Sequence, residues 1–270
     1  MSYTKKISQA LPALIILLLD DSGSQADCMP GTNDAKFIWV ERYVGHVFKQ
    51  LMALSTDMQN DIATIKPRYY VSTILYGTAP QLWGDEVMDI QAVLEKYGAA
   101  KNSLGLGGNL HGTDTAAAFA FALDILQRTI TQERFRHSFP PLVFHLTDGE
   151  SQTDAESTVN QIKQLATEDG NVLVVNAYIG TRTSLSYKGP EDFPGYLHES
   201  EAGPNEENTR LFRMSSETPE CIRQNLLGDG TFSNFRAGSR LFFDVRTKEM
   251  LKNVIQVVGS IDSRADRTNR

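Results

Sequence analysis

The sequence predicts an α/β fold: a doubly wound, mostly parallel sheet of about six strands, with one antiparallel edge strand and helices on both faces. Continuous apolar runs such as Leu14 to Leu19 are typical of strands that are covered on both faces of a parallel sheet. Helical patterns alternate with these runs along the chain, as in doubly wound proteins. Because 41% of the 270 residues are apolar, the chain can also fill a large core.

The first half of the chain is predicted to contain a strand, two helices and a hairpin. Apolar residues recur at helical spacing from Lys36 to Leu54, after the first strand and its loop, which predicts an amphipathic helix. Tyr69 to Tyr76 and Pro80 to Trp83 are predicted to pair as an antiparallel hairpin at the sheet edge. A short helix over Asp89 to Lys96 and a glycine-rich loop over Gly98 to Gly112 follow.

Strands and helices alternate more regularly in the second half of the chain. The predicted elements are a helix over Ala116 to Leu126, a strand over Leu142 to Thr147, a helix over Glu156 to Ala166, a strand over Val172 to Ile179, a strand over Leu241 to Val245 and a helix over Lys248 to Ile261. In such a sheet the ligand crevice lies at the carboxyl ends of the strands.

Between the last two predicted strands the pattern changes to glycine, proline, serine and acidic residues. We therefore expect a single domain over residues 1–270 with an irregular insertion at about 180–238, in which Pro219 to Leu226 is helical. The polar tail at 262–270 is expected to be frayed.

Charge and cysteine content exclude several classes of partner. The net charge is −7 and no cluster of Lys and Arg is present, so we expect no nucleic-acid partner. Cys28 and Cys221 are far apart and form no zinc or redox motif, which predicts free thiols in a reducing compartment. The run from Ala10 to Leu19 is too short for a membrane span of about 20 residues, and removing it as a signal peptide would delete the first strand. A cytoplasmic location and no membrane span are expected.

Oxygen-bearing side chains follow two predicted strands and a glycine-rich loop. Asp20, Ser22 and Ser24 come directly after the first strand, where the backbone can turn all three side chains toward one point. Thr113 follows the glycine-rich loop, and Asp148 follows the strand that ends at Thr147. Carboxylate and hydroxyl oxygens are the ligands that Mg²⁺ prefers, so a magnesium site is predicted at this edge of the sheet.

In this order and spacing, the pattern Asp-x-Ser-x-Ser, a Thr in a glycine-rich turn and Thr-Asp-Gly resembles the metal-ion-dependent adhesion site (MIDAS) of von Willebrand factor A (VWA) domains, also called integrin I-like domains. The resemblance covers about residues 10 to 180 and implies a Rossmann-like VWA fold. It implies that Ser22 and Ser24 contact the metal directly, that Asp20 and Asp148 act through water or hydrogen bonds, and that Thr113 is a direct or water-bridged ligand. Mg²⁺ is the expected ion, and Mn²⁺ or Ca²⁺ would also suit these ligands.

The function that this resemblance implies is binding rather than catalysis. Neutral hydroxyl ligands leave the cation under-compensated, so a partner's Asp or Glu carboxylate can bind as an additional ligand. The first strand and its loop are most similar to tellurium-resistance TerY-type proteins of bacteria, which are associated with a protein kinase and a PP2C-type phosphatase. This similarity predicts a non-enzymatic, intracellular adaptor in a stress-response, defence or phosphorylation-signalling system.

Other interpretations of the same residues compete with this hypothesis. Asp20 and Asp21 could serve a metal-dependent phosphotransfer enzyme or a receiver-like domain, but Ser22 replaces the acid that phosphotransferases need, and the strand ending at Tyr76 carries no phosphoacceptor Asp. Asp21 alone is expected to be solvated or to cap a helix. Asp114 is a further candidate for an outer acid of the metal site, whereas His111 and His145 receive no metal role.

Overall fold

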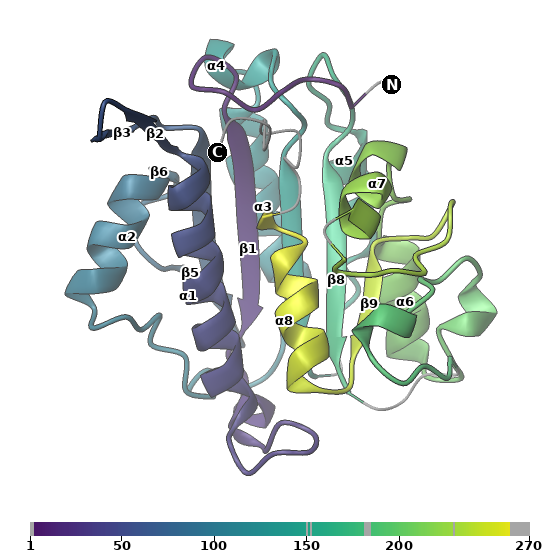
Figure 1. The fold of residues 1–270 in the computed structure, drawn as a ribbon. Helices are drawn as coiled ribbons and strands as arrows, with labels where there is room; N and C mark the ends of the chain where they lie inside the picture. The colour runs from purple at the N-terminus through teal and green to yellow at the C-terminus, as the bar shows by residue number, and fades with distance from the viewer. Residues whose placement is uncertain (1–2, 150, 152, 181–184, 229, 260–270) are drawn as a thin grey trace.

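A seven-stranded sheet forms the centre of the protein in the computed structural model, which describes residues 3–149, 151, 153–180, 185–228 and 230–259 (Figure 1). The strands are β1 (Ala13–Asp20), β4 (Tyr69–Tyr76), β5 (Pro80–Leu82), β6 (Met88–Asp89), β7 (Leu142–Thr147), β8 (Leu173–Ile179) and β9 (Phe242–Val245). Their order is β5-β4-β1-β7-β8-β9, and β6 also pairs with β4. The pairs from β4 to β9 are parallel, and β5 and β6 run antiparallel to β4. The predicted fold class is confirmed.

Helices cover both faces of this sheet. They are α1 (Lys36–Leu54), α2 (Ile90–Ala99), α3 (Thr115–Thr129), α4 (Glu133–Arg136), α5 (Glu156–Gln164), α6 (Glu206–Met214), α7 (Glu220–Gly228) and α8 (Lys248–Gln256). Figure 1 shows α1 and α8 side by side in front of the sheet, where α2 also packs against α1. Helix α5 packs against both α3 and α6.

The strand order creates a crevice at the carboxyl end of β1. All residues of β1 are buried, as expected for its continuous apolar run. The chain passes from β1 to β4 on one side, whereas β7 lies on the other side of β1. The register places Asp20 opposite Tyr76 of β4, and Leu19 opposite Leu146 of β7. The loops after β1 and β7 therefore begin next to each other, at the point where ligands bind in open α/β sheets.

A second, two-stranded sheet was not predicted. It consists of β2 (Thr56–Gln59) and β3 (Ile62–Ile65), which pair antiparallel after α1. The two-residue turn between them is Asn60 and Asp61, both at positive φ (49° and 62°). Asn and Asp are favoured at positive φ in two-residue hairpin turns, so the sequence of the turn indicates a hairpin although the sequences of the two strands do not.

The segment that was expected to be an irregular insertion contributes helices and part of the core. It contains α6, which was not predicted, and α7, which agrees with the helical segment predicted there. Four aromatic side chains of this segment and one of β9 form a buried cluster. They are Phe193, Tyr196, Phe232 and Phe235 of the segment and Phe243 of β9. Residues 181–184, the end of the last predicted helix and the predicted frayed tail lie outside the described residues. In the described part of the chain, no helix combines the length and the apolar character needed to cross a membrane.

Candidate metal centre

Asp20 is the last residue of β1, and its side chain is buried, with 2% of the residue exposed. Its Oδ1 accepts a hydrogen bond from the Ser22 N–H at 2.8 Å, and its Oδ2 accepts one from the Thr147 hydroxyl at 2.5 Å. Burial raises the pKa of Asp20 to about 6, although the hydrogen bonds from Thr147 and Ser22 act in the opposite direction. The ionised carboxylate would therefore be stabilised by a cation.

The two serines lie on a short turn that directs both hydroxyl groups the same way. Ser22 has an extended backbone and precedes a 3-10 turn over Gly23–Ala26. The Oγ atoms of Ser22 and Ser24 are 3.1 Å apart. The Ser24 hydroxyl also donates to Oδ1 of Asp148 at 2.8 Å. The loops after β1 and β7 are therefore joined directly through their predicted site residues.

Gly149 marks the space on which the predicted residues converge. A methyl group on its α carbon would lie 3.0 Å from Thr113 Oγ1, 3.7 Å from Asp20 Oδ2 and 3.7 Å from Ser24 Oγ. Thr113 is buried and immediately precedes the residue that caps α3. Together with the contacts of Ser22 and Asp148, this distance pattern shows that all five predicted side chains gather around one small space.

The chemistry of these side chains fits a hard divalent cation. They supply two carboxylates and three hydroxyls, from Asp20, Ser22, Ser24, Thr113 and Asp148. Among the described residues, no three His, Cys, Asp or Glu side chains form a cluster that could hold a metal. Hydroxyl and carboxylate oxygens differ from the Cys and His ligands that are typical of structural zinc, and they are the ligands that hard cations such as Mg²⁺, Mn²⁺ and Ca²⁺ prefer.

Lys36 belongs to this centre and was not predicted. It is the first residue of α1, and its Nζ lies 2.6 Å from Asp148 Oδ2 and 3.2 Å from the Ser24 carbonyl oxygen. The Asp148 side chain is fully buried, and 13% of the Lys36 side chain is exposed. Nothing in the sequence around Lys36 distinguishes it from an ordinary surface lysine.

The expectation for Asp21 was wrong. Asp21 is buried rather than solvated, and it caps no helix. Its Oδ1 accepts hydrogen bonds from the N–H groups of Gly107 and Gly108 at 2.8 and 2.7 Å. Its carbonyl oxygen accepts one from the Leu110 N–H at 3.0 Å. Asp21 therefore holds the glycine-rich loop that leads to Thr113, while Asp20 faces β7.

The other candidates have structural partners. Asp114 caps α3 by accepting from the Ala117 N–H at 2.9 Å, and it also accepts from the Thr153 hydroxyl at 2.7 Å. His145 is buried, 2.6 Å from the Tyr76 hydroxyl and 2.8 Å from Asn176 Oδ1. Burial lowers the pKa of His145 to about 4, so the ring is neutral at pH 7.

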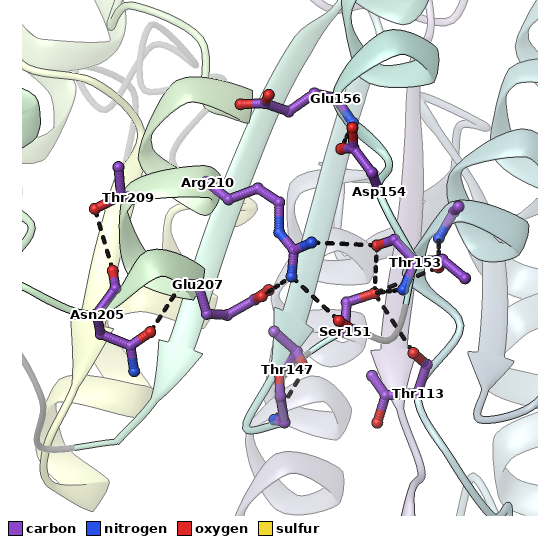
Figure 2. A network of polar contacts seen from close by, with 12 residues as sticks. Thr113, Thr147, Ser151, Thr153, Asp154, Glu156, Asn205, Glu207, Thr209 and Arg210 are labelled. Atoms are coloured by element: carbon purple, nitrogen blue, oxygen red, sulfur yellow. Dashed lines mark hydrogen bonds and ion pairs between the residues drawn. The ribbon is translucent and has the colours of Figure 1, made fainter.

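Helix α6 braces the loop that follows β7. Figure 2 shows Arg210 extending from α6 toward this loop, where it donates to the carbonyl oxygens of Ser151 at 3.3 Å and Thr153 at 3.4 Å. Glu207, one turn earlier on α6, forms an ion pair with Arg210. The Ser151 hydroxyl lies 3.5 Å from the Thr113 carbonyl oxygen. The segment expected to be an insertion therefore supports the backbone next to the site.

Comparison with protein-family models and with curated proteins gives no match to this sequence. Solved structures do match. The structure of proximal thread matrix protein 1 from the mussel byssus, with a zinc-occupied MIDAS motif, matches with a TM-score of 0.52 and 11% identity over 94% of this chain. This chain spans 46% of the mussel chain, which is about half its length.

Two further structures match with lower TM-scores. The conserved hypothetical protein BatB from Bacteroides thetaiotaomicron has a TM-score of 0.47 and 12% identity, over 92% of this chain and 98% of that chain. The vWF domain of the type V pili tip protein Mfa5 from Porphyromonas gingivalis has a TM-score of 0.37 and 17% identity, over 52% of this chain and 39% of that chain. The sheet order and the mussel structure together identify the fold as that of VWA domains, as predicted.

Proposed function

We propose that this protein is a non-enzymatic, metal-dependent interaction module that binds a carboxylate of a protein partner. The observation that carries the proposal is the convergence of Asp20, Ser22, Ser24, Thr113 and Asp148 around the space at Gly149. Mg²⁺ bound there would supply a Lewis acid that accepts an oxygen of the partner's Asp or Glu side chain.

Each residue has a distinct part in this proposal. The hydroxyls of Ser22, Ser24 and Thr113 are neutral donors of oxygen, and they hold the cation without cancelling its charge. Asp20 and Asp148 provide the negative charge and orient the hydroxyl-bearing loops through hydrogen bonds to Thr147 and Ser24. Because the groups that would contact the cation directly are neutral in this proposal, the cation would favour an anionic ligand from outside the chain.

The contacts of the neighbouring groups support binding over phosphotransfer. A receiver-like mechanism would use Asp20 and Asp21 together, but these carboxylates face different partners, since Asp21 accepts from the amides of the glycine-rich loop. His145, on the strand that leads to Asp148, is buried between Tyr76 and Asn176 and is not available as a general base. Phosphotransfer remains the alternative function, and it predicts turnover of a phosphorylated substrate that depends on Asp20.

The partner and setting are proposed from the resemblance of the first strand and its loop. The segment Leu17 to Ser24 is similar to that of TerY-type proteins of bacteria. We therefore propose a cytoplasmic adaptor whose partners include a protein kinase and a PP2C-type phosphatase. This setting rests on the residues of that segment alone, whereas the metal site rests on the geometry described above.

A thermal-shift experiment tests the metal site. A cation present at 100 times its dissociation constant stabilises the folded state by about 2.7 kcal/mol, which raises the Tm by roughly 5 to 10 °C. We expect this rise with Mg²⁺, Mn²⁺ or Ca²⁺, and we expect Asp20→Asn or Ser22→Ala to remove it. Asp57→Asn is the matched control, because Asp57 pairs with Arg68 away from the site. No difference between Asp20→Asn and Asp57→Asn would contradict the proposal.

Capture of a partner tests the binding function itself. The immobilised protein should retain its partner in Mg²⁺ and release it in EDTA, because the cation bridges the two proteins. Changing one acidic residue of the identified partner to its amide should abolish retention, whereas the same change at other acidic residues should not. Retention that survives EDTA would place the partner elsewhere on the surface.

A further inference from the structure

The contact between Lys36 and Asp148 places an ammonium group inside the candidate metal centre. Lys36 Nζ lies 2.6 Å from Asp148 Oδ2, slightly closer than the roughly 2.7 to 2.9 Å that is typical of a charge-assisted N–H to carboxylate hydrogen bond. The Asp148 side chain is fully buried, and Lys36 is the group that neutralises it. A buried carboxylate without such a partner is strongly destabilising, so removal of the Lys36 ammonium group would destabilise the loop after β7.

The same ammonium group touches more than one part of the centre. It donates to the Ser24 carbonyl oxygen at 3.2 Å, while the Ser24 hydroxyl donates to the other oxygen of Asp148 at 2.8 Å. Both carboxylate oxygens of Asp148 are therefore occupied, one by Ser24 and the other by Lys36. Asp27, an exposed side chain 4.0 Å from Lys36 Nζ, is a weaker alternative partner for the ammonium group.

We propose that Lys36 is an internal counter-cation that competes with the divalent ion for Asp148 and thereby sets the metal affinity of the site. This inference rests on the metal site proposed above. A cation that draws on Asp148 and Ser24 must approach the Lys36 ammonium group, and like charges repel strongly where water is excluded. Metal binding is weakened by this repulsion, and the metal-free protein is stabilised by the same ion pair.

Three substitutions of Lys36 separate charge from shape. Lys36→Met removes the charge but keeps an unbranched side chain, Lys36→Gln keeps an N–H donor toward Asp148, and Lys36→Arg keeps the charge. In calorimetric titrations of the full chain with Mn²⁺ alone, we expect the Met and Gln variants to bind about tenfold more tightly than wild type. The Arg variant should stay close to wild type.

Stability of the metal-free protein provides the second measurement. In EDTA, Lys36→Met should melt several degrees lower than wild type, because Asp148 loses its ion-pair partner. Lys36→Gln should melt between the two, so it supplies a folded neutral variant if Lys36→Met does not fold. A gain in Mn²⁺ affinity accompanied by a loss of metal-free stability is the signature of competition.

Two other results would overturn this role. Neutral variants that bind Mn²⁺ more weakly than wild type would show that Lys36 positions Asp148 for the metal, and unchanged affinity would show that the ammonium group does not influence it. In both cases wild type still binds Mn²⁺, so the proposed function would stand. Absence of Mn²⁺ binding in wild type and in every variant would overturn the metal site together with this inference.

Discussion

The strands β1 and β9 each place a buried aspartate at or near their carboxyl ends, and the two carboxylates have different partners. Asp244 on β9 lies 2.5 Å from Arg246 Nε and accepts from the Tyr196 hydroxyl at 2.5 Å. Asp20 on β1 accepts from the Thr147 hydroxyl and the Ser22 N–H. In the described part of the chain, Asp20 forms no ion pair.

This difference separates a carboxylate that is paired within the fold from one that, in the proposed metal centre, would lie next to a cation. Burying a charge is costly unless it is paired, and Arg246 pairs with Asp244 within the fold. Among the described residues, the hydrogen-bond donors to Asp20 are neutral groups, and burial raises its pKa to about 6. The carboxylate of Asp244 on β9 is therefore neutralised by a side chain of the fold. The carboxylate of Asp20 on β1 has no ion-pair partner in the described part of the chain.

The largest effect is expected from breaking the pair on β9. Arg246→Met would remove the guanidinium that pairs with the buried Asp244, which costs about 3 to 5 kcal/mol and lowers the Tm by roughly 10 °C. Metal affinity should not change, because Asp244 lies outside the candidate centre. Thermal melting and Mn²⁺ titration of the same sample measure both. A cost no larger than that of a surface substitution would remove the contrast between the two strands.

An intermediate effect is expected from pH, through Asp20. Because its folded pKa of about 6 exceeds the ordinary value of 3.8, the folded state binds this proton more tightly than the unfolded state does. The stability that this gives is complete below about pH 4 and is lost as pH rises through 6, by roughly 3 kcal/mol at most. His145 acts in the opposite sense, since its folded pKa of about 4 makes the protein lose stability as pH falls from 6.5.

The two groups titrate over overlapping ranges and partly cancel, so the contribution of Asp20 must be measured as a difference. We expect metal-free Asp20→Asn to gain stability relative to wild type as pH rises from 4 to 7, measured by urea unfolding at each pH. His145 is present in both proteins and does not affect this difference. If the stability difference between Asp20→Asn and wild type stayed constant across this pH range, the pKa of Asp20 would not be raised by folding. The contrast with Asp244 would then disappear.

The parts of the fold that the sequence predicted have local signals. The strand β1 and the helix α1 carry periodicity that is visible without any partner, and both were predicted with accurate boundaries. Helix α6 was missed because its few apolar side chains, such as Leu211 and Phe212, did not by themselves indicate a helix. They are buried because α6 packs against β8. The strands β2 and β3 were missed because they are short and largely exposed.

The candidate site shows the same division. The five oxygen-bearing residues were predicted because their pattern lies in three short segments. The polar partners of these five residues were not predicted, because they come from distant parts of the chain that only the tertiary structure brings together. Lys36 and Asp148, for example, are 112 positions apart in the chain. Thr147 carried a partial signal, since it precedes Asp148 in the Thr-Asp-Gly pattern, but its hydrogen bond to Asp20 depends on the pairing of β1 and β7.

The smallest effect is expected at Asp21, the neighbour of Asp20 that the amides of Gly107 and Gly108 already satisfy. Asp21→Ala leaves these two N–H groups without their acceptor, which costs about 1 to 3 kcal/mol, and it loosens the loop that leads to Thr113. Metal affinity should fall only slightly, in contrast to its loss in Asp20→Asn. Asp21→Asn, which keeps an acceptor oxygen for both amides, should recover most of the stability. If Asp21→Ala instead abolished the metal-induced rise in Tm, both adjacent carboxylates would belong to the metal centre, and the receiver-like alternative would regain support.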